Sequence, residues 1–251
     1  MAEIPRSYVD GFTRAINRVS ERARKGLSDA LASIDMSQDV ATVREQVIAA
    51  MQIWCGGATD QAAVLAAAFY DGLREIELGV PMGAVASSGR NPDATDGAVR
   101  AFAEKLVDGK PDEFVALCLE RLDYETKVAA NEAVLINGHR DSRRPRYARV
   151  PDGAETCDFC LMLASRGFVY QSEEAASHAH SGCDCRTVPS WKTNGVEGYD
   201  PRAIYGRWQD AIDAKAKERA ERNGTDEGEE RRRIMETYKR AASNAKRRKR
   251  R

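Results

Sequence analysis

Apolar residues recur at helical spacing through the first part of the chain. Over residues 1–35 they fall at steps that are sums of three and four, and charged residues occupy the opposite face. This stripe predicts a long amphipathic helix, which must lay its apolar face on other elements. The stripe positions are Ile4, Tyr8, Phe12, Ile16, Val19, Leu27, Leu31 and Ile34.

The next two apolar segments predict two further helices that pack on the first. The earlier one should stop at Gly56 and Gly57, and the later one at Gly79, because glycine pairs and proline interrupt helices. Residues 79–96 are rich in Gly, Pro, Ser and Asn and follow neither a helical nor a strand period. They predict a mobile loop.

Two more helices are expected before residue 140. One carries an apolar stripe up to Gly109, and the other begins at Pro111. Proline suits the first turn of a helix, and Asn or Gly suits the position just after its end. The second helix is therefore expected to end at Asn137 and Gly138.

The pattern changes after residue 140. The stretch HRDSRRPRYARVPDG, residues 139–153, has no long apolar stripe, and its Tyr147 and Val150 favour a short strand. Residues 168–170 and 186–188 are expected to form two more short strands, each beside part of a cysteine cluster.

The last part of the chain combines one apolar stripe with a long charged segment. Ile204, Trp208 and Ile212 predict a helix near residues 201–216, and the low apolar content of residues 214–251 predicts a solvated helix or a disordered tail. The expected fold is mainly α with a small β module (α+β). It divides into a helical domain at 1–140, the β module at 141–192, and a helix with a charged basic tail at 193–251.

Charge is unevenly distributed along the chain. The formal net charge is +0, but residues 214–251 hold 15 Lys and Arg against 7 Asp and Glu, which leaves +8 there and −8 elsewhere. The opening MAEIPRSYVDGF lacks the apolar core of a signal peptide, so folding in a cytoplasm is expected. No apolar run approaches the roughly 20 residues of a membrane-spanning helix.

Four of the six cysteines and two of the three histidines lie within residues 157–185. Cys157 and Cys160 form a CxxC pair, and His180, Cys183 and Cys185 form HxxCxC. In reducing surroundings such a cluster favours metal binding over disulfides, and CxxC lets one turn direct two sulfurs at one ion. We expect a structural zinc site formed from these five candidates.

The ligand set stays open at this point. The preferred four are Cys157, Cys160, His180 and Cys183, with Cys185 as the substitute for Cys183, while His178 competes with His180. The alternative to metal binding is a group of ordinary reduced thiols. A redox role for the CxxC pair is disfavoured, because no thioredoxin-like βαβ pattern surrounds Cys157.

Catalysis is not expected. Four protein ligands would close the coordination shell, whereas a hydrolytic zinc keeps a position open for water. The deaminase order of HxE before PCxxC is absent from the sequence, as is HExxH. Cys55 and Cys118 are expected to be core thiols, and His139 a solvated loop residue.

The cluster resembles the end of the minor head proteins related to protein F of phage Mu. The matching pieces are CDFC at 157–160, RGFVY at 166–170 and HSGCDCRT at 180–187. One departure is Ser181, where family members often have Pro. The resemblance could reach back to about residue 80. It implies a minor component of a tailed-phage head that associates with the portal and acts in head assembly, genome packaging or delivery, with a structural role for the five candidate ligands.

The chain ends in six consecutive cations, which suit nonspecific contact with DNA through counterion release. They are Lys246, Arg247, Arg248, Lys249, Arg250 and Arg251, and Arg231–Arg233 add three more. A solvated terminus that only aids solubility is the alternative. The leading hypothesis is a virion protein made in the host cytoplasm. Its rival is a zinc-containing nucleic-acid-binding regulator, which the −8 balance of residues 1–213 disfavours.

Overall fold

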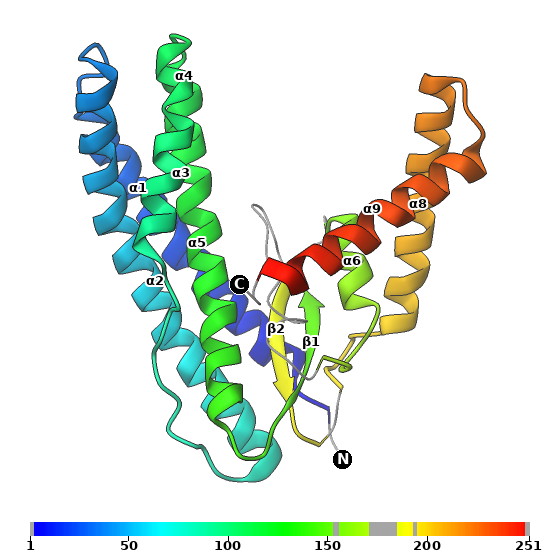
Figure 1. Cartoon of the computed structure of the whole chain (residues 1–251). Coiled ribbons are helices and arrows are strands. Elements are labelled where there is room, and N and C mark those ends of the chain that lie inside the picture. The colour runs from blue at the N-terminus through cyan, green and yellow to red at the C-terminus, as the bar shows by residue number, and fades with distance from the viewer. Residues whose placement is uncertain (1–2, 153–155, 171–184, 193–194, 249–251) are drawn as a thin grey trace.

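The computed structural model describes residues 3–152, 156–170, 185–192 and 195–248, with side chains described up to residue 240. The described chain is mainly helical and contains a two-stranded antiparallel sheet, which confirms the predicted α+β class (Figure 1). No helix within these ranges combines the length and the apolar character that a bilayer crossing needs.

Three long helices, α1 (Arg6–Ala32), α2 (Val40–Leu78) and α5 (Pro111–Arg140), run side by side through one half of the molecule (Figure 1). The first helix uses the predicted stripe, since Phe12, Ile16, Leu27 and Leu31 are all buried. Ile4 lies outside it. Its backbone forms a parallel bridge with Val196, so the start of the chain is paired with a segment beyond the sheet.

The predicted break at Gly56 and Gly57 is wrong, because α2 runs through both glycines. A glycine inside a helix costs about 1 kcal/mol relative to alanine. Burial of Cys55, Ala58 and Ala62 on the flanking turns offsets this cost, because α2 is held along its length by α1 and α5.

The segment from Gly79 to Asn91 is a loop, but Pro92 already begins α3 (Pro92–Phe102), which is followed by α4 (Glu104–Val107). Asn91 caps α3 by accepting a hydrogen bond from the backbone of Asp93. The backbone N–H groups of Met82 and Ala84 donate to the Asp71 carboxylate at 2.9 and 2.8 Å. This anchoring on α2 differs from the mobile loop that the composition predicts.

The expected end of α5 at Asn137 and Gly138 is also wrong, since the helix continues to Arg140. Gly138 serves packing here, because a side chain at this position would overlap the buried hydroxyl end of Tyr147. Asn137 uses its amide to exchange two hydrogen bonds with the backbone of Val85. His139 therefore lies exposed in the last helical turn and not in a loop.

The predicted strands around Tyr147 and at 186–188 are confirmed as β1 (Arg146–Pro151) and β2 (Cys185–Ser190). The two strands pair antiparallel, with Arg149 opposite Thr187. The expected strand at 168–170 is only a single bridge between Tyr170 and Tyr147. A short helix that the sequence pattern did not predict, α6 (Asp158–Ala164), lies between the strands and buries Leu161, Met162 and Leu163.

Beyond the sheet, α8 (Pro201–Asn223) and α9 (Glu227–Arg248) form a helical hairpin on the other side of the molecule (Figure 1). Ile204, Trp208 and Ile212 are buried on α8, as predicted. One apolar cluster contains residues of α1, α2 and α5 together with residues of both strands, α6, α8 and α9. The sheet and α6 thus pack on the long helices through a continuous core.

Candidate metal centre and the surrounding module

The CxxC pair lies at the beginning of α6. Cys157 is the N-cap residue, and its sulfur accepts a hydrogen bond from the backbone N–H of Cys160 at 3.4 Å. Cys157 is exposed, whereas Cys160 is 1% exposed. The two sulfurs therefore lie at the start of the same helix, that of Cys157 at the surface and that of Cys160 inside. The helix dipole favours negative charge at this end of the helix.

Cys160 meets Cys185, which begins β2. Their Sγ atoms lie 3.3 Å apart, although 25 residues separate them in the sequence. Two ligands of a tetrahedral zinc ion, each at about 2.3 Å, would lie about 3.8 Å apart. A small adjustment would therefore let both sulfurs bind one ion, and the geometry favours Cys185 as a ligand beside Cys160.

A buried arginine stands against this sulfur pair. Arg149 of β1 is fully buried and donates from Nη2 to the Cys185 sulfur at 2.9 Å and from Nη1 to the Thr187 hydroxyl at 3.1 Å. The antiparallel register places Arg149, Thr187 and Cys185 on one face of the sheet. A guanidinium at this position stabilises a thiolate, the form in which cysteine binds metals.

A second buried arginine ties the sheet to the first helix. Arg186 is fully buried and donates to the side-chain oxygen of Asn17 at 3.0 Å. Neither Arg149 nor Arg186 was singled out from the sequence. The sequence pattern that could have identified them is an arginine inside each of two short strand-like segments, RYARVP and CRTVPS. A charge buried in such a strand is costly unless it has buried partners.

The donors at this site fit a zinc ion as far as they are described. Two convergent sulfurs and a third at the same helix start match the soft ligands that zinc prefers. Within the described ranges, no group of three or more His, Cys, Asp or Glu gathers closely enough to hold a metal. His178, His180 and Cys183 fall in 171–184, outside the described residues, so the structure leaves the full ligand set untested.

The end of β2 is held by two carboxylates from the long helices. Glu77 of α2 accepts hydrogen bonds from the Ser190 hydroxyl at 2.8 Å and from the backbone of Trp191 and Lys192. Asp141, just after α5, accepts from the indole N–H of Trp191 at 3.1 Å. These bonds fix the strand that carries Cys185 relative to α2 and α5.

The basic tail is described only in part. Helix α9 continues to Arg248, so the backbone of Lys246, Arg247 and Arg248 is helical, as one of the two predicted alternatives has it. The side chains of these three residues, and the whole of Lys249, Arg250 and Arg251, lie outside the described residues.

The upstream cations of this helix are engaged within the fold. Arg231 pairs with Asp213 at 2.6 Å, and Arg233 pairs with Glu229 and Glu230 at 2.6 and 3.0 Å. These two cations are therefore less available to DNA than their sequence suggests.

The two other cysteines are core thiols, as expected. Cys55 and Cys118 are fully buried among apolar residues of α2 and α5. Burial raises the pKa of the Cys118 thiol to about 12, and burial together with the nearby Glu125 carboxylate raises the pKa of the Cys55 thiol. Both thiols are thus kept protonated and unreactive.

Fold and site together define a mainly helical protein with a small cysteine-bearing β module. The sequence model described as VG15 protein matches residues 3–211, more than four fifths of the chain, so the chain belongs to the VG15 protein family. Membership indicates a phage protein. No curated protein and no solved structure matches the chain. The match begins at residue 3, ahead of α1, and ends within α8.

Proposed function

We propose that this chain is a minor head protein of a tailed phage, associated with the portal and acting in head morphogenesis or genome delivery. One observation carries the proposal: the described parts of the Mu protein F-like motif, residues 157–160 and 185–187, converge, with the sulfurs of Cys160 and Cys185 3.3 Å apart. Membership of a phage protein family over residues 3–211 supports it independently.

In this proposal the cysteine module holds a structural zinc ion. Cys160 and Cys185 supply two ligands, and the others come from Cys157, His178, His180 and Cys183. The ion would link the start of α6 to the start of β2, a task that suits a closed site without an open position for water. The role requires no catalysis, so turnover of nucleic acid by the purified chain would count against it.

The long helices and the tail have separate tasks in the proposal. The helices α1, α2 and α5 form a rigid body that docks on the portal or on other head proteins. The six terminal cations contact packaged DNA through its phosphates, without reading its sequence. The assembled particle is then the site of action.

Purified phage particles provide the test. Mass spectrometry should find this chain in intact heads, and cryo-electron microscopy of a particle carrying a tagged copy should place the tag near the portal vertex. Absence of the chain from mature heads and from assembly intermediates would overturn the proposal. A sequence-selective, salt-insensitive footprint of the free protein on duplex DNA would instead favour the rival regulator.

A further inference from the structure

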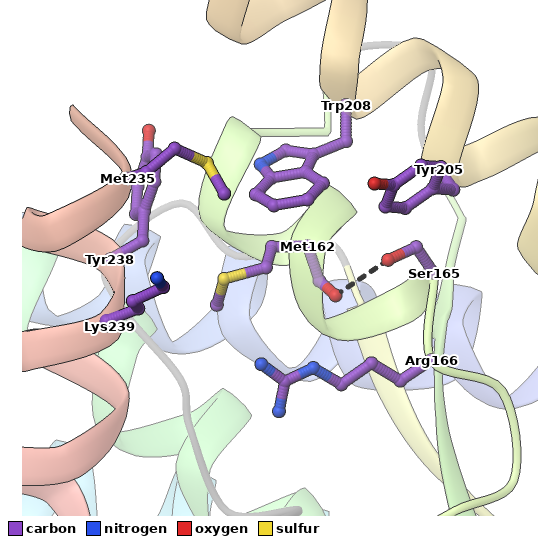
Figure 2. Close-up of a pocket in the computed structure, with 8 residues that line it drawn as sticks. All are labelled: Met162, Ser165, Arg166, Tyr205, Trp208, Met235, Tyr238 and Lys239. Atoms are coloured by element: carbon purple, nitrogen blue, oxygen red, sulfur yellow. Dashed lines mark hydrogen bonds between the residues drawn. The ribbon is translucent and has the colours of Figure 1, made fainter. Parts of the chain in front are cut away.

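A cavity of about 330 Å³ opens where α6 meets the hairpin of α8 and α9. Neither the described cysteines nor Lys246–Arg248 are among the residues that line it. Figure 2 shows that Met162 forms its floor, with Trp208 of α8 and Met235 of α9 facing one another above it. The other lining residues are Ser165, Arg166, Tyr205, Tyr238 and Lys239.

The lining is suited to binding a protein segment. It is mostly apolar and contains two methionines, two tyrosines and a tryptophan. Methionine side chains adapt to differently shaped ligands, and Trp, Tyr, Met and Arg are enriched in protein interfaces. Tyr205 remains 50% exposed at the rim, so an approaching chain would meet an aromatic surface first.

Trp208, which lines this cavity, carries an unsatisfied polar group that is itself fully buried. Its side chain is almost fully buried, at 6% exposure, and its indole N–H has no hydrogen-bond acceptor among the described residues. The nitrogen edge of the ring points toward Met235 across the cavity (Figure 2). A buried donor without a partner costs about 1–3 kcal/mol, which an acceptor on a ligand would recover.

Two cations at the rim have no acidic partner among the residues that the structure describes. Arg166 and Lys239 are exposed, and no ion pair within the described part of the chain includes either of them. The neighbouring cations differ in this respect, because Lys215 pairs with Asp158 at 2.7 Å and Arg231 pairs with Asp213. Figure 2 shows the Arg166 guanidinium below Met162 and the Lys239 ammonium beside Met162, on the side of α9.

We propose that this cavity is a docking site for an acidic segment of a partner protein, which inserts one large apolar side chain. The apolar anchor would lie between Met162, Trp208 and Met235. When the flexible Met235 side chain moves aside, a backbone or side-chain oxygen of the segment would accept the buried Trp208 N–H. An adjacent Asp or Glu would pair with Arg166 and Lys239. The charge of the rim selects an acidic partner over a basic one.

The site is built partly from chain outside the family match. Met162, Arg166 and Trp208 lie within residues 3–211, whereas Met235 and Lys239 lie beyond them. Helix α9 thus completes the wall and contributes one of the two cations. The proposal goes beyond the proposed head function and does not depend on it.

A peptide array measured with the full chain tests the proposal. Peptides should carry a central Leu, Met, Phe, Trp or Ala, flanked by Asp and Glu, by Asn and Gln, or by Lys and Arg. We expect saturable binding to acidic peptides with a large apolar anchor, and affinities at least tenfold weaker for the Ala anchor and for basic flanks. Failure of every acidic peptide to bind would overturn the proposal.

Three variants and one control locate the binding. Lys239→Glu and Arg166→Gln should each weaken acidic-peptide binding at least fivefold, and Trp208→Phe should weaken it while keeping an aromatic wall. Arg232→Glu, on an exposed position of α9 away from the cavity, should leave binding unchanged. Equal effects of Lys239→Glu and Arg232→Glu would contradict a local site. If the full chain self-associates and Lys239→Glu abolishes this association, the cavity binds a second copy of this chain. That result would overturn the proposal of a separate partner protein.

Discussion

Arg74, near the end of α2, donates from Nε to the carboxylate of Asp141, just after α5, at 2.8 Å, although 67 residues separate the two in the sequence. The Asp141 side chain is only 1% exposed. It also accepts hydrogen bonds from the Tyr70 hydroxyl and the Trp191 indole, both at 3.1 Å. A single carboxylate therefore ties α2, the end of α5 and the end of β2 together.

Asp141→Asn should destabilise the whole fold. The substitution keeps the size of the side chain but leaves the largely buried Arg74 cation without its counter-charge, which costs about 3–5 kcal/mol. Urea denaturation followed by circular dichroism measures this loss. Asp29→Asn, which breaks the exposed pair with Lys25, is the matched control and should change nothing measurable. Similar midpoints for the two variants would contradict the assigned role of Asp141.

The same carboxylate should contribute to acid unfolding. Burial alone would raise the pKa of Asp141. Hydrogen bonds from Arg74, the Arg143 backbone and Tyr70 outweigh this effect and hold the pKa below its ordinary value. A lowered folded-state pKa means that the stabilisation is present above the unfolded value, about 3.9, and is lost as pH falls through the folded value. The free energy of unfolding should therefore fall less steeply below about pH 4 in Asp141→Asn than in the wild type. If the free energy of unfolding falls equally steeply with decreasing pH in Asp141→Asn and in the wild type, Asp141 makes no such contribution.

The sequence predicted a helix correctly where the buried residues form a stripe along one face of that helix. The stripe from Phe12 to Leu31 specifies α1, because its apolar positions keep helical spacing on both sides of the single Gly26. Local signals failed where tertiary packing overrode them. Gly56 and Gly57 continue a helix that neighbours hold on both sides, and Gly138 marks a close approach of Tyr147 and not a helix end.

The sequence predicted that the cysteines form a cluster, but it did not predict which of them lie close together in space. CxxC spacing placed Cys157 and Cys160 at one turn, and their position at the start of α6 confirms that proximity. The sequence ranked Cys183 ahead of Cys185, and spacing alone could not show that the strand register brings Cys185 to Cys160. Burial of Arg149 beside Cys185 depends on the same pairing of distant strands.

Gly138→Ala should destabilise the protein, although alanine favours helices. A methyl group here would overlap the Tyr147 hydroxyl end, and that ring is buried and cannot swing away. Overpacking of this kind costs about 1–3 kcal/mol, more than the gain in helix propensity of about 1 kcal/mol. Thermal unfolding should show a lower midpoint.

Gly97→Ala is the matched control for this packing claim. Gly97 lies within α3, and a methyl group there would meet nothing within 4 Å. The variant should keep or raise the unfolding midpoint, because only the propensity gain remains. A stabilised Gly138→Ala variant would show that Tyr147 is free to move.

Metal analysis addresses the cysteine module directly. The purified chain should contain about one zinc ion, and Cys160→Ser or Cys185→Ser should lose it, because each removes one of the two convergent sulfurs. Hydrogen exchange should then rise over residues 145–190 and stay unchanged in α1. Cys118→Ala, in a separate apolar cluster, should keep the metal. Full stability of the double variant in the presence of a chelator would exclude a structural ion.

The salt dependence of DNA binding separates the tail from the rest of α9. Replacing Lys246–Arg251 with glutamines removes six cations, so the slope of log affinity against log salt should fall by up to about 5. Glutamines at Arg231, Arg232 and Arg233 remove three cations, of which Arg231 and Arg233 already pair with acidic side chains. That control should therefore lower the slope by about 1. Equal slopes for the tail variant and the wild type, measured by fluorescence anisotropy on duplex DNA, would show that the tail does not neutralise phosphates.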